Sequence, residues 1–176
     1  YNKGRYRAFN LSPYDDTILL DTDYMVNSNK LLQTFELPTD FCCHDTTSYL
    51  MHPEAGQETL SSNGFNTLWA TSITFKKTKR AEQIFNCLEM VQHNFHHYAN
   101  IHGFISSTFR NDYGLTLATR IVNGHTVTKE DVIPWNLLHI SSKTPIYKNS
   151  NDEFNTEYTV MHDNWQRGKI RKEYIT

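Results

Sequence analysis

A short apolar strand that ends in two acidic residues constrains the fold of this chain more than any other feature. The run Thr17-Ile18-Leu19-Leu20 follows a turn-like segment, Ser12–Asp16, and leads directly into Asp21-Thr22-Asp23. Continuous apolar runs of this length are typical of strands buried on both faces, as in a parallel sheet. Side chains alternate along a strand, so Asp21 and Asp23 point to the same side where the strand ends. We therefore expect two carboxylates together at one edge of an α/β sheet.

Two neighbouring carboxylates are unfavourable on their own, because like charges repel and neither group is easily desolvated. Ligands of open α/β sheets bind beyond the carboxyl ends of the strands, where this pair is expected. Oxygen ligands select hard cations, so Asp21 and Asp23 are candidate ligands of Mn²⁺ or Mg²⁺. The alternative is that both aspartates are ordinary turn residues that face solvent, since Asp is common in turns.

The pattern of apolar residues predicts further elements on both sides of a long loop. A helix is expected to begin near Ser28, and residues Phe41–Asn66 read as a loop rich in Ser, Thr and His. A second strand is expected at Leu68–Phe75, and a long helix carries an apolar stripe from Ala81 to Tyr98. Another helix is expected from about Asp112 to Asn123-Gly124. This order favours an α/β sandwich with a mainly parallel sheet.

Composition limits the class of protein. A chain of 176 residues, of which 38% are hydrophobic, is enough for one globular domain with a sizeable core. The net charge of −2 argues against a general nucleic-acid binder, which needs a basic surplus for phosphate contacts. The three cysteines have no spacing typical of disulfides or zinc sites, so a reducing, cytoplasmic location is expected. No apolar run approaches the about 20 residues that a membrane span needs, so none is expected.

The segment Ser12–Val26, read as S-P-Y-D-D-T, an apolar strand and D-T-D, resembles the metal-binding segment of GT-A-fold glycosyltransferases. The resemblance is to bacterial and phage-type sequences in particular, and it extends more loosely over Lys3–Gly124. It implies a GT-A-like α/β sandwich with a mainly parallel sheet. The segment before Asp21 is shorter than a nucleoside-binding βαβ unit, which needs about 30 residues or more. Residues 1–176 are therefore expected to form one domain, the metal-binding and acceptor-side part of such an enzyme.

The resemblance also implies a reaction. A metal-dependent glycosyltransferase moves a sugar from a nucleotide-sugar donor to an acceptor, which here would be a glycan, lipid, protein or modified nucleobase. In that reading Asp23 is a direct metal ligand, and Asp21 contacts the metal, the ribose of the donor or both. The metal, Mn²⁺ or Mg²⁺, would stabilise the departing nucleoside diphosphate as a Lewis acid.

Further roles follow from position within the family pattern. Asp112 stands where the family often has an acidic residue near the acceptor hydroxyl, and Asn111 is grouped with it as a substrate-binding residue. An N-cap at the start of the expected helix explains Asp112 equally well. The basic cluster Lys3, Arg5 and Arg7 would offset the charge of the donor diphosphate.

A late histidine serves some metal-dependent relatives as a third metal ligand. His139 is the candidate here, with His125 and His162 as rivals. Neutral imidazole is a common metal ligand, but a structural histidine is the simpler interpretation of each.

Two other functions remain open. The chain is alternatively a non-catalytic, degenerate transferase-like binding domain. A haloacid-dehalogenase-type phosphatase also uses D-x-D after a buried strand, but there a turn of small residues follows the first aspartate. Tyr24-Met25 places bulky side chains at that turn, which argues against the phosphatase.

Overall fold

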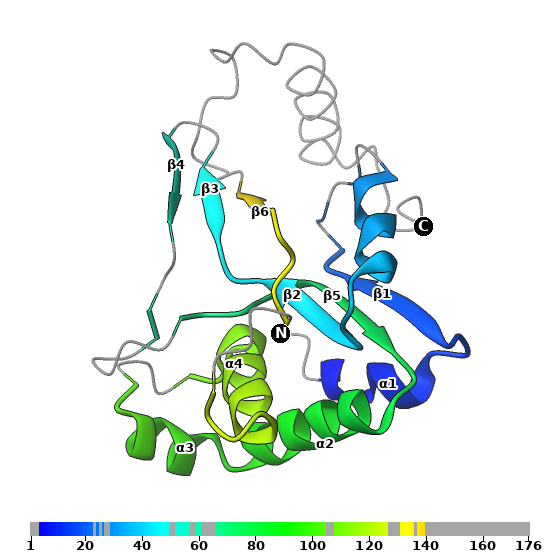
Figure 1. Ribbon diagram of the computed structural model, residues 1–176. Coiled ribbons are helices and arrows are strands. Elements are labelled where there is room, and N and C mark those ends of the chain that lie inside the picture. Colours follow the sequence, from blue (N-terminus) through cyan, green and yellow to red (C-terminus); the bar gives the residue numbers. More distant parts are fainter. Residues whose placement is uncertain are drawn as a thin grey trace, which may run out of the picture.

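The computed structural model describes residues 4–22, 24, 26, 29–49, 52–56, 59–60, 66–104, 108–126, 131–135 and 137–139. Figure 1 shows how the elements within these residues are arranged. In chain order they are η1 (Arg5–Arg7), α1 (Ala8–Leu11), β1 (Asp16–Leu20), η2 (Asn29–Glu36), β2 (Phe41–His44), β3 (Thr47–Tyr49), β4 (His52–Gly56), β5 (Trp69–Lys76), α2 (Lys79–His93), α3 (Phe95–His102), α4 (Asn111–Val122) and β6 (Leu137–His139).

The main sheet is antiparallel, so the expected GT-A-like sandwich with a mainly parallel sheet is wrong. Its strand order is β1-β5-β2, and the central strand β5 runs antiparallel to both neighbours. Asp16 pairs with Lys76 and Leu20 with Ser72 along β1. The strand expected at residues 17–20 does form, but its apolar side chains are only half-buried. An apolar run indicates that a segment is buried, but it does not determine whether the neighbouring strand runs parallel or antiparallel to it.

Part of the segment expected to be a loop, Phe41–Asn66, forms strands instead. All four residues of β2 are buried, and the strand pairs with β5. Its adjacent cysteines, Cys42 and Cys43, pack as small apolar residues, which the polar composition of the surrounding sequence obscured. A second sheet has the order β4-β3-β6, in which β3 is antiparallel to β4 and parallel to β6.

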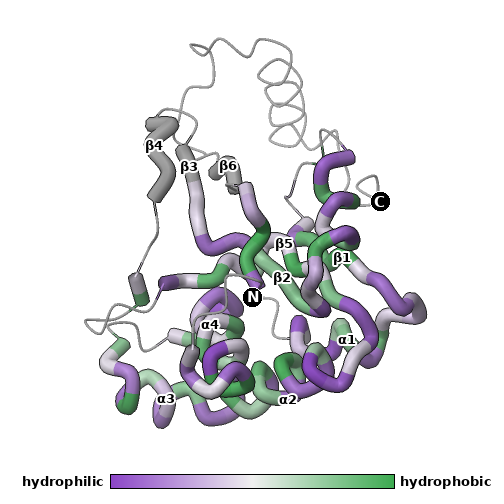
Figure 2. The backbone as a smooth tube through the Cα atoms, in the orientation of Figure 1, coloured by the Kyte–Doolittle hydropathy of each residue, from purple (hydrophilic) through white to green (hydrophobic). Residues whose placement is uncertain are grey.

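The helices α2 and α4 cover one face of the main sheet and contact each other closely (Figure 1). Phe75 of β5 and Phe85 of α2 meet edge to face in this core, with 4.9 Å between ring centroids. Figure 2 shows hydrophobic stretches of β2, β5 and α2 side by side. Gly114 allows the close approach of α4, because a Cβ there would lie 2.8 Å from Cδ1 of Leu88.

The helical prediction is confirmed at α4, whereas the helix expected to begin near Ser28 is the 3-10 helix η2. The apolar stripe from Ala81 to Tyr98 spans two helices, α2 and α3, which meet at Asn94. Thr78 caps α2, since its hydroxyl accepts a hydrogen bond from the Ala81 N–H at 3.2 Å. The helix expected at residues 112–124 is α4, which begins one residue earlier and ends at Val122.

Burial governs the chemistry of the three cysteines. All three thiols are free, and burial raises the pKa of Cys42 and of Cys87 to about 11. Burial also holds the pKa of the Cys43 thiol well above its usual range. These thiols therefore stay protonated and poorly nucleophilic at neutral pH.

Helix length bears on the expectation about membranes. Across the described segments, no helix has both the length and the apolar character needed to cross a bilayer.

Candidate functional site

Asp21 lies where β1 leaves the main sheet. Its N–H donates a hydrogen bond to the Thr71 carbonyl of β5 at 2.9 Å, which anchors the backbone at this point. The Asp21 side chain is 36% exposed and can therefore be reached from solvent. Nη2 of Arg5, from η1, forms an ion pair with Oδ1 of Asp21. The fold thus brings one of the predicted diphosphate-binding cations to one of the predicted metal ligands.

The guanidinium of Arg5 is buried and only partly satisfied. Its side chain is 2% exposed, and Nε and Nη1 have no hydrogen-bond partner among the residues that the structure describes. Burying a charged group with unused donors is costly. A guanidinium also presents its donors in a planar fork that matches two oxygens of a phosphate or carboxylate. The chemistry of Arg5 therefore suits an anionic group beside Asp21, and its two unused nitrogens are closed to solvent in this structure.

The other members of the predicted basic and acidic sets differ in position. Arg7 is exposed, and its guanidinium contacts Tyr6, with 5.5 Å from Cζ to the ring centroid and 3.3 Å from Nε to the hydroxyl. Arg7 thus contacts Tyr6, whereas Arg5 contacts Asp21. Lys3 and Asp23 lie outside the described residues.

Asp112 ties the first turn of α4 to the beginning of β5. Its Oδ1 accepts a hydrogen bond from the Ala70 N–H at 2.9 Å, and its Oδ2 accepts one from Nη2 of Arg110 at 3.1 Å. The side chain is 14% exposed. Arg110 is the N-cap residue of α4, so Asp112 is not the cap, and Asn111 is the first residue of the helix.

Asp21 and Asp112 therefore meet the same part of the main sheet. Asp21 contacts Thr71, and Asp112 contacts Ala70, the preceding residue of β5. Consecutive residues of a strand direct their backbone groups to opposite edges of it, so Asp21 approaches β5 from the side of β1 and Asp112 from the other side. The fold thus attaches two residues that are far apart in sequence to neighbouring residues of one strand.

A metal ion at this place would need ligands beyond Asp21. The described segments contain no group of three or more His, Cys, Asp or Glu residues that could hold a metal. His139 lies in β6, where its backbone pairs with Tyr49 of β3. Mg²⁺ typically takes only one or two carboxylates and completes its shell with water and substrate phosphates. A single accessible carboxylate at the end of β1 fits such a loosely held ion.

Arg80 forms an ion-pair cluster that sequence reasoning missed. The segment Lys76–Arg80 reads as a solvated turn, but Nη1 of Arg80 lies 2.5 Å from Oδ1 of Asp40, and Nη2 lies 2.6 Å from Oδ2 of Asp131. Asn123 joins the cluster, since its Oδ1 accepts from Nη2 of Arg80 at 2.9 Å. The two aspartates are distant in sequence from Arg80, so no local pattern predicted the contact.

The charges of this cluster stabilise one another. Burial alone would lower the pKa of Arg80, but the hydrogen bonds and charges of Asp131 and Asp40 outweigh it and raise that pKa. Burial alone would likewise raise the pKa of Asp40, but hydrogen bonds from Thr78 and Arg80 and the charge of Arg80 lower it. The cluster joins α2 to the ends of β2 and α4, so its role is structural.

His44 of β2 is a buried histidine that stays neutral. Its Nδ1 lies 3.0 Å from the Trp135 carbonyl, so this nitrogen carries the proton and donates. Nε2 is buried and has no partner among the described residues. Burial lowers the pKa of His44, an effect that Lys30 adds to and that the Trp135 carbonyl and Asp45 oppose.

This environment predicts a pH-dependent stability. The pKa of His44 in the folded chain is below its ordinary value of 6.5, so the unfolded chain takes up the proton first as pH falls. The stability that depends on a neutral His44 is therefore fully present above about pH 6.5. Below that pH the free energy of unfolding falls by up to about 1.4 kcal/mol per pH unit. Urea unfolding between pH 8 and 5 should therefore show a steeper loss for the wild type than for His44→Asn.

The comparison isolates His44 from other histidines. Burial, His125 and Arg120 lower the pKa of His102. His102 therefore also lowers the stability as pH falls, and it does so equally in the wild type and in His44→Asn. Equal pH slopes for the wild type and His44→Asn would contradict the prediction.

Comparison of the chain with protein-family models, with curated proteins and with solved structures finds no match.

Proposed function

We propose that this chain acts in metal-dependent sugar transfer from a nucleotide-sugar donor, with Arg5 and Asp21 at the donor diphosphate. The ion pair between the buried Arg5 and the partly exposed Asp21 carries the proposal, because Arg5 keeps two nitrogens without a partner in the described part of the chain. A diphosphate would supply acceptor oxygens for those nitrogens. Asp21 would help to hold the cation that binds the other side of the diphosphate.

The proposed chemistry assigns separate tasks to the metal and to the protein. Mn²⁺ or Mg²⁺ would neutralise charge on the departing nucleoside diphosphate. Arg5 would orient the same group through charge-assisted hydrogen bonds and stabilise its charge in a water-poor setting. Asp23 would complete the carboxylate pair at the end of β1.

Asp112 is the proposed residue on the acceptor side. It is held at Ala70, one residue before the Thr71 that holds Asp21, and in the proposed arrangement it lies beside the transferred sugar. There its carboxylate would orient the acceptor hydroxyl or take its proton. The acceptor itself would be a hydroxyl-bearing glycan, lipid, protein or modified nucleobase. Three free cysteines support the cytoplasmic location that we propose for this activity.

A non-catalytic nucleotide-binding domain is the second candidate. Both carboxylate oxygens of Asp112 accept hydrogen bonds, one from Ala70 and one from Arg110. These two bonds tie the start of α4 to β5 and account for Asp112 without a catalytic role. A chain that binds the donor diphosphate without transferring the sugar would fit this arrangement.

Calorimetry with UDP, GDP, ADP, CDP and dTDP, each with Mn²⁺ and with EDTA, tests the proposal. Arg5→Met should weaken Mn²⁺-dependent binding by about 10- to 100-fold, the range expected for hydrogen bonds to a charged group. Asp21→Asn and Asp23→Ala should each reduce the dependence on Mn²⁺. Arg7→Met is the matched control, because Arg7 is exposed and contacts Tyr6. The control should change affinity by less than about 3-fold.

The outcomes separate the alternatives. Mn²⁺-dependent binding without release of nucleoside diphosphate from any nucleotide-sugar would favour the non-catalytic domain. No metal-dependent binding of UDP, GDP, ADP, CDP or dTDP would contradict both. Equal losses in Arg5→Met and Arg7→Met would show that the basic segment acts only through its overall charge.

A further inference from the structure

Arg5 and Asp21 hold each other in a closed arrangement. Nη2 of Arg5 binds Oδ1 of Asp21, and the Arg5 side chain is 2% exposed. Its Nε and Nη1 have no partner among the described residues and are closed to solvent. A hydrogen bond needs a donor–acceptor distance of about 3 Å, so a diphosphate in solvent cannot reach these nitrogens in this arrangement. The segment that carries Arg5 must therefore move before a diphosphate can bind it.

Arg5 also opposes a metal ion at Asp21. The guanidinium already occupies Oδ1 of this carboxylate, which is the predicted metal ligand. A divalent cation on the same carboxylate would lie within a few ångströms of the guanidinium, and the two positive charges would repel each other. The repulsion is strengthened by the burial of Arg5, because solvent screens a buried charge poorly. The ion pair and a bound metal therefore compete for Asp21.

The segment with Arg5 is held lightly by the rest of the chain. Within η1 and α1, only Arg5 is buried. Tyr6 of η1 meets His93 of α2 edge to face, with 6.1 Å between ring centroids, and Phe9 of α1 packs against the core at 5.9 Å from Phe75. Figure 1 shows α1 beside α2. Helices of three or four residues are marginal on their own, so η1 can open locally while Phe9 stays in place.

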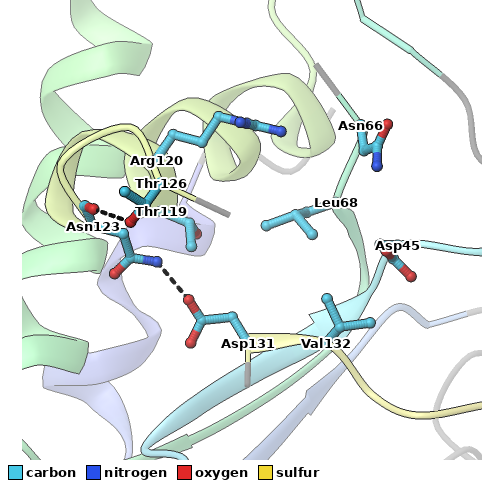
Figure 3. A pocket seen from close by; sticks show the side chains of 9 residues that line it. All are labelled: Asp45, Asn66, Leu68, Thr119, Arg120, Asn123, Thr126, Asp131 and Val132. Carbon is cyan, nitrogen blue, oxygen red and sulfur yellow. Dashed lines mark hydrogen bonds between the residues drawn. The ribbon is translucent and has the colours of Figure 1, made fainter. Parts of the chain in front are cut away.

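Another arginine could be considered for the diphosphate. Figure 3 shows Arg120 and Asp131 among the side chains that line a pocket at the C-terminal end of α4. The pocket has a volume of about 40 Å³, which is room for only a few water molecules. The carboxylate of Asp131, which accepts a hydrogen bond from Nδ2 of Asn123 at 2.6 Å, would also repel an anion. This pocket is therefore unsuited to a diphosphate, and Arg5 is the guanidinium to be released.

We propose that the Arg5–Asp21 ion pair is an autoinhibitory latch on the donor site, which a divalent metal ion opens. A cation at Asp21 displaces Arg5, and η1 then moves so that the nitrogens of Arg5 face the diphosphate. The latch rests on the proposed function, because it is the step that makes that site accessible. It also requires Arg5 to have opposite effects on two equilibria: Arg5 weakens the binding of the metal alone and strengthens the binding of the nucleotide with the metal.

Binding of Mn²⁺ alone, followed by water-proton relaxation without any nucleotide, tests the latch. Arg5→Met should bind Mn²⁺ at least about 5-fold more tightly than the wild type, because a competing cation has been removed. The same variant should bind nucleoside diphosphates with Mn²⁺ more weakly, as stated above. Arg7→Met is the matched control, since Arg7 is exposed and contacts Tyr6. It should change the Mn²⁺ affinity by less than about 3-fold.

Modification of arginine by phenylglyoxal, located by mass spectrometry, gives a second measurement that does not need a change at Arg5. In the wild type without metal, the buried Arg5 should react much more slowly than the exposed Arg7. Asp21→Asn removes the charge that holds Arg5 and should raise its rate of modification. Mn²⁺ should raise the same rate in the wild type. Arg7 is the reference within each sample and should react equally under all conditions.

The outcomes distinguish failure of the latch from failure of the proposed function. Equal Mn²⁺ affinities of Arg5→Met and the wild type would overturn the latch even where nucleotide binding is intact. Failure of either Asp21→Asn or Mn²⁺ to raise the modification of Arg5 would overturn it as well. If no nucleoside diphosphate binds with Mn²⁺, the proposed function is wrong and the latch falls with it.

Discussion

Replacing Arg80 with Met is expected to lower the free energy of unfolding by about 2–4 kcal/mol. The change leaves Asp131, whose side chain is 4% exposed, without its cation. Removing one partner of a buried ion pair typically costs about 3–5 kcal/mol. We expect less here because the Arg80 side chain is 31% exposed and solvent screens its charge. Methionine keeps much of the aliphatic stem of Arg80, so the decrease in the free energy of unfolding comes from the charge and its hydrogen bonds. Equilibrium unfolding in urea measures this decrease.

Lys79→Met is the matched control for this prediction. Lys79 precedes Arg80 in α2 and pairs with Glu82 at 2.8 Å on the surface. The loss of such an exposed pair should cost less than about 1 kcal/mol. Similar losses in the two variants would contradict a special role for the Arg80 cluster.

The acid stability of the wild type and Arg80→Met should also differ. The pKa of Asp40 in the folded chain is below its ordinary value of 3.8. The stability that the charged Asp40 contributes is therefore present above that value and is lost as pH falls through the folded pKa. Arg80→Met removes one cause of the shift. Its stability should therefore fall less steeply with acid than that of the wild type.

Asp112→Asn is expected to lower sugar-transfer turnover by about 100-fold or more if Asp112 acts as the proposed acid-base group. The amide oxygen of Asn can still accept the hydrogen bond from the Ala70 N–H, so the attachment of α4 to β5 is retained. Donor binding and melting temperature should therefore change little. The assay is metal-dependent release of nucleoside diphosphate from a nucleotide-sugar in the presence of the acceptor.

Asp112→Ala separates catalysis from support of the fold. It leaves the N–H of the buried Ala70 without its acceptor. An unsatisfied buried donor of this kind should cost about 1–3 kcal/mol of stability. Normal turnover in Asp112→Asn combined with early melting of Asp112→Ala would show that Asp112 only ties α4 to β5.

Much of the candidate site could be recognised from sequence, although its metal and catalytic roles are still predictions. The D-x-D segment and the resemblance that it carries singled out Asp21, Arg5 and Asp112. The structure brings Arg5 to Asp21 and separates it from Arg7, which contacts Tyr6. Sequence spacing could not make this distinction, because it does not show that η1 directs Arg5 toward Asp21 and Arg7 toward solvent.

The amino-acid sequence by itself determined the local elements with a clear apolar pattern, namely β1, β5 and α4. Hydrophobic periodicity works there because it records which face of a short segment is buried. Only the tertiary structure decided that β5 runs antiparallel to β1 and β2, and that the polar segment after Pro38 supplies the buried strand β2. It also decided that Arg80 pairs with Asp40 and Asp131, which both lie far from it in sequence. Strand direction and long-range ion pairs depend on the path of the whole chain, which no local pattern contains.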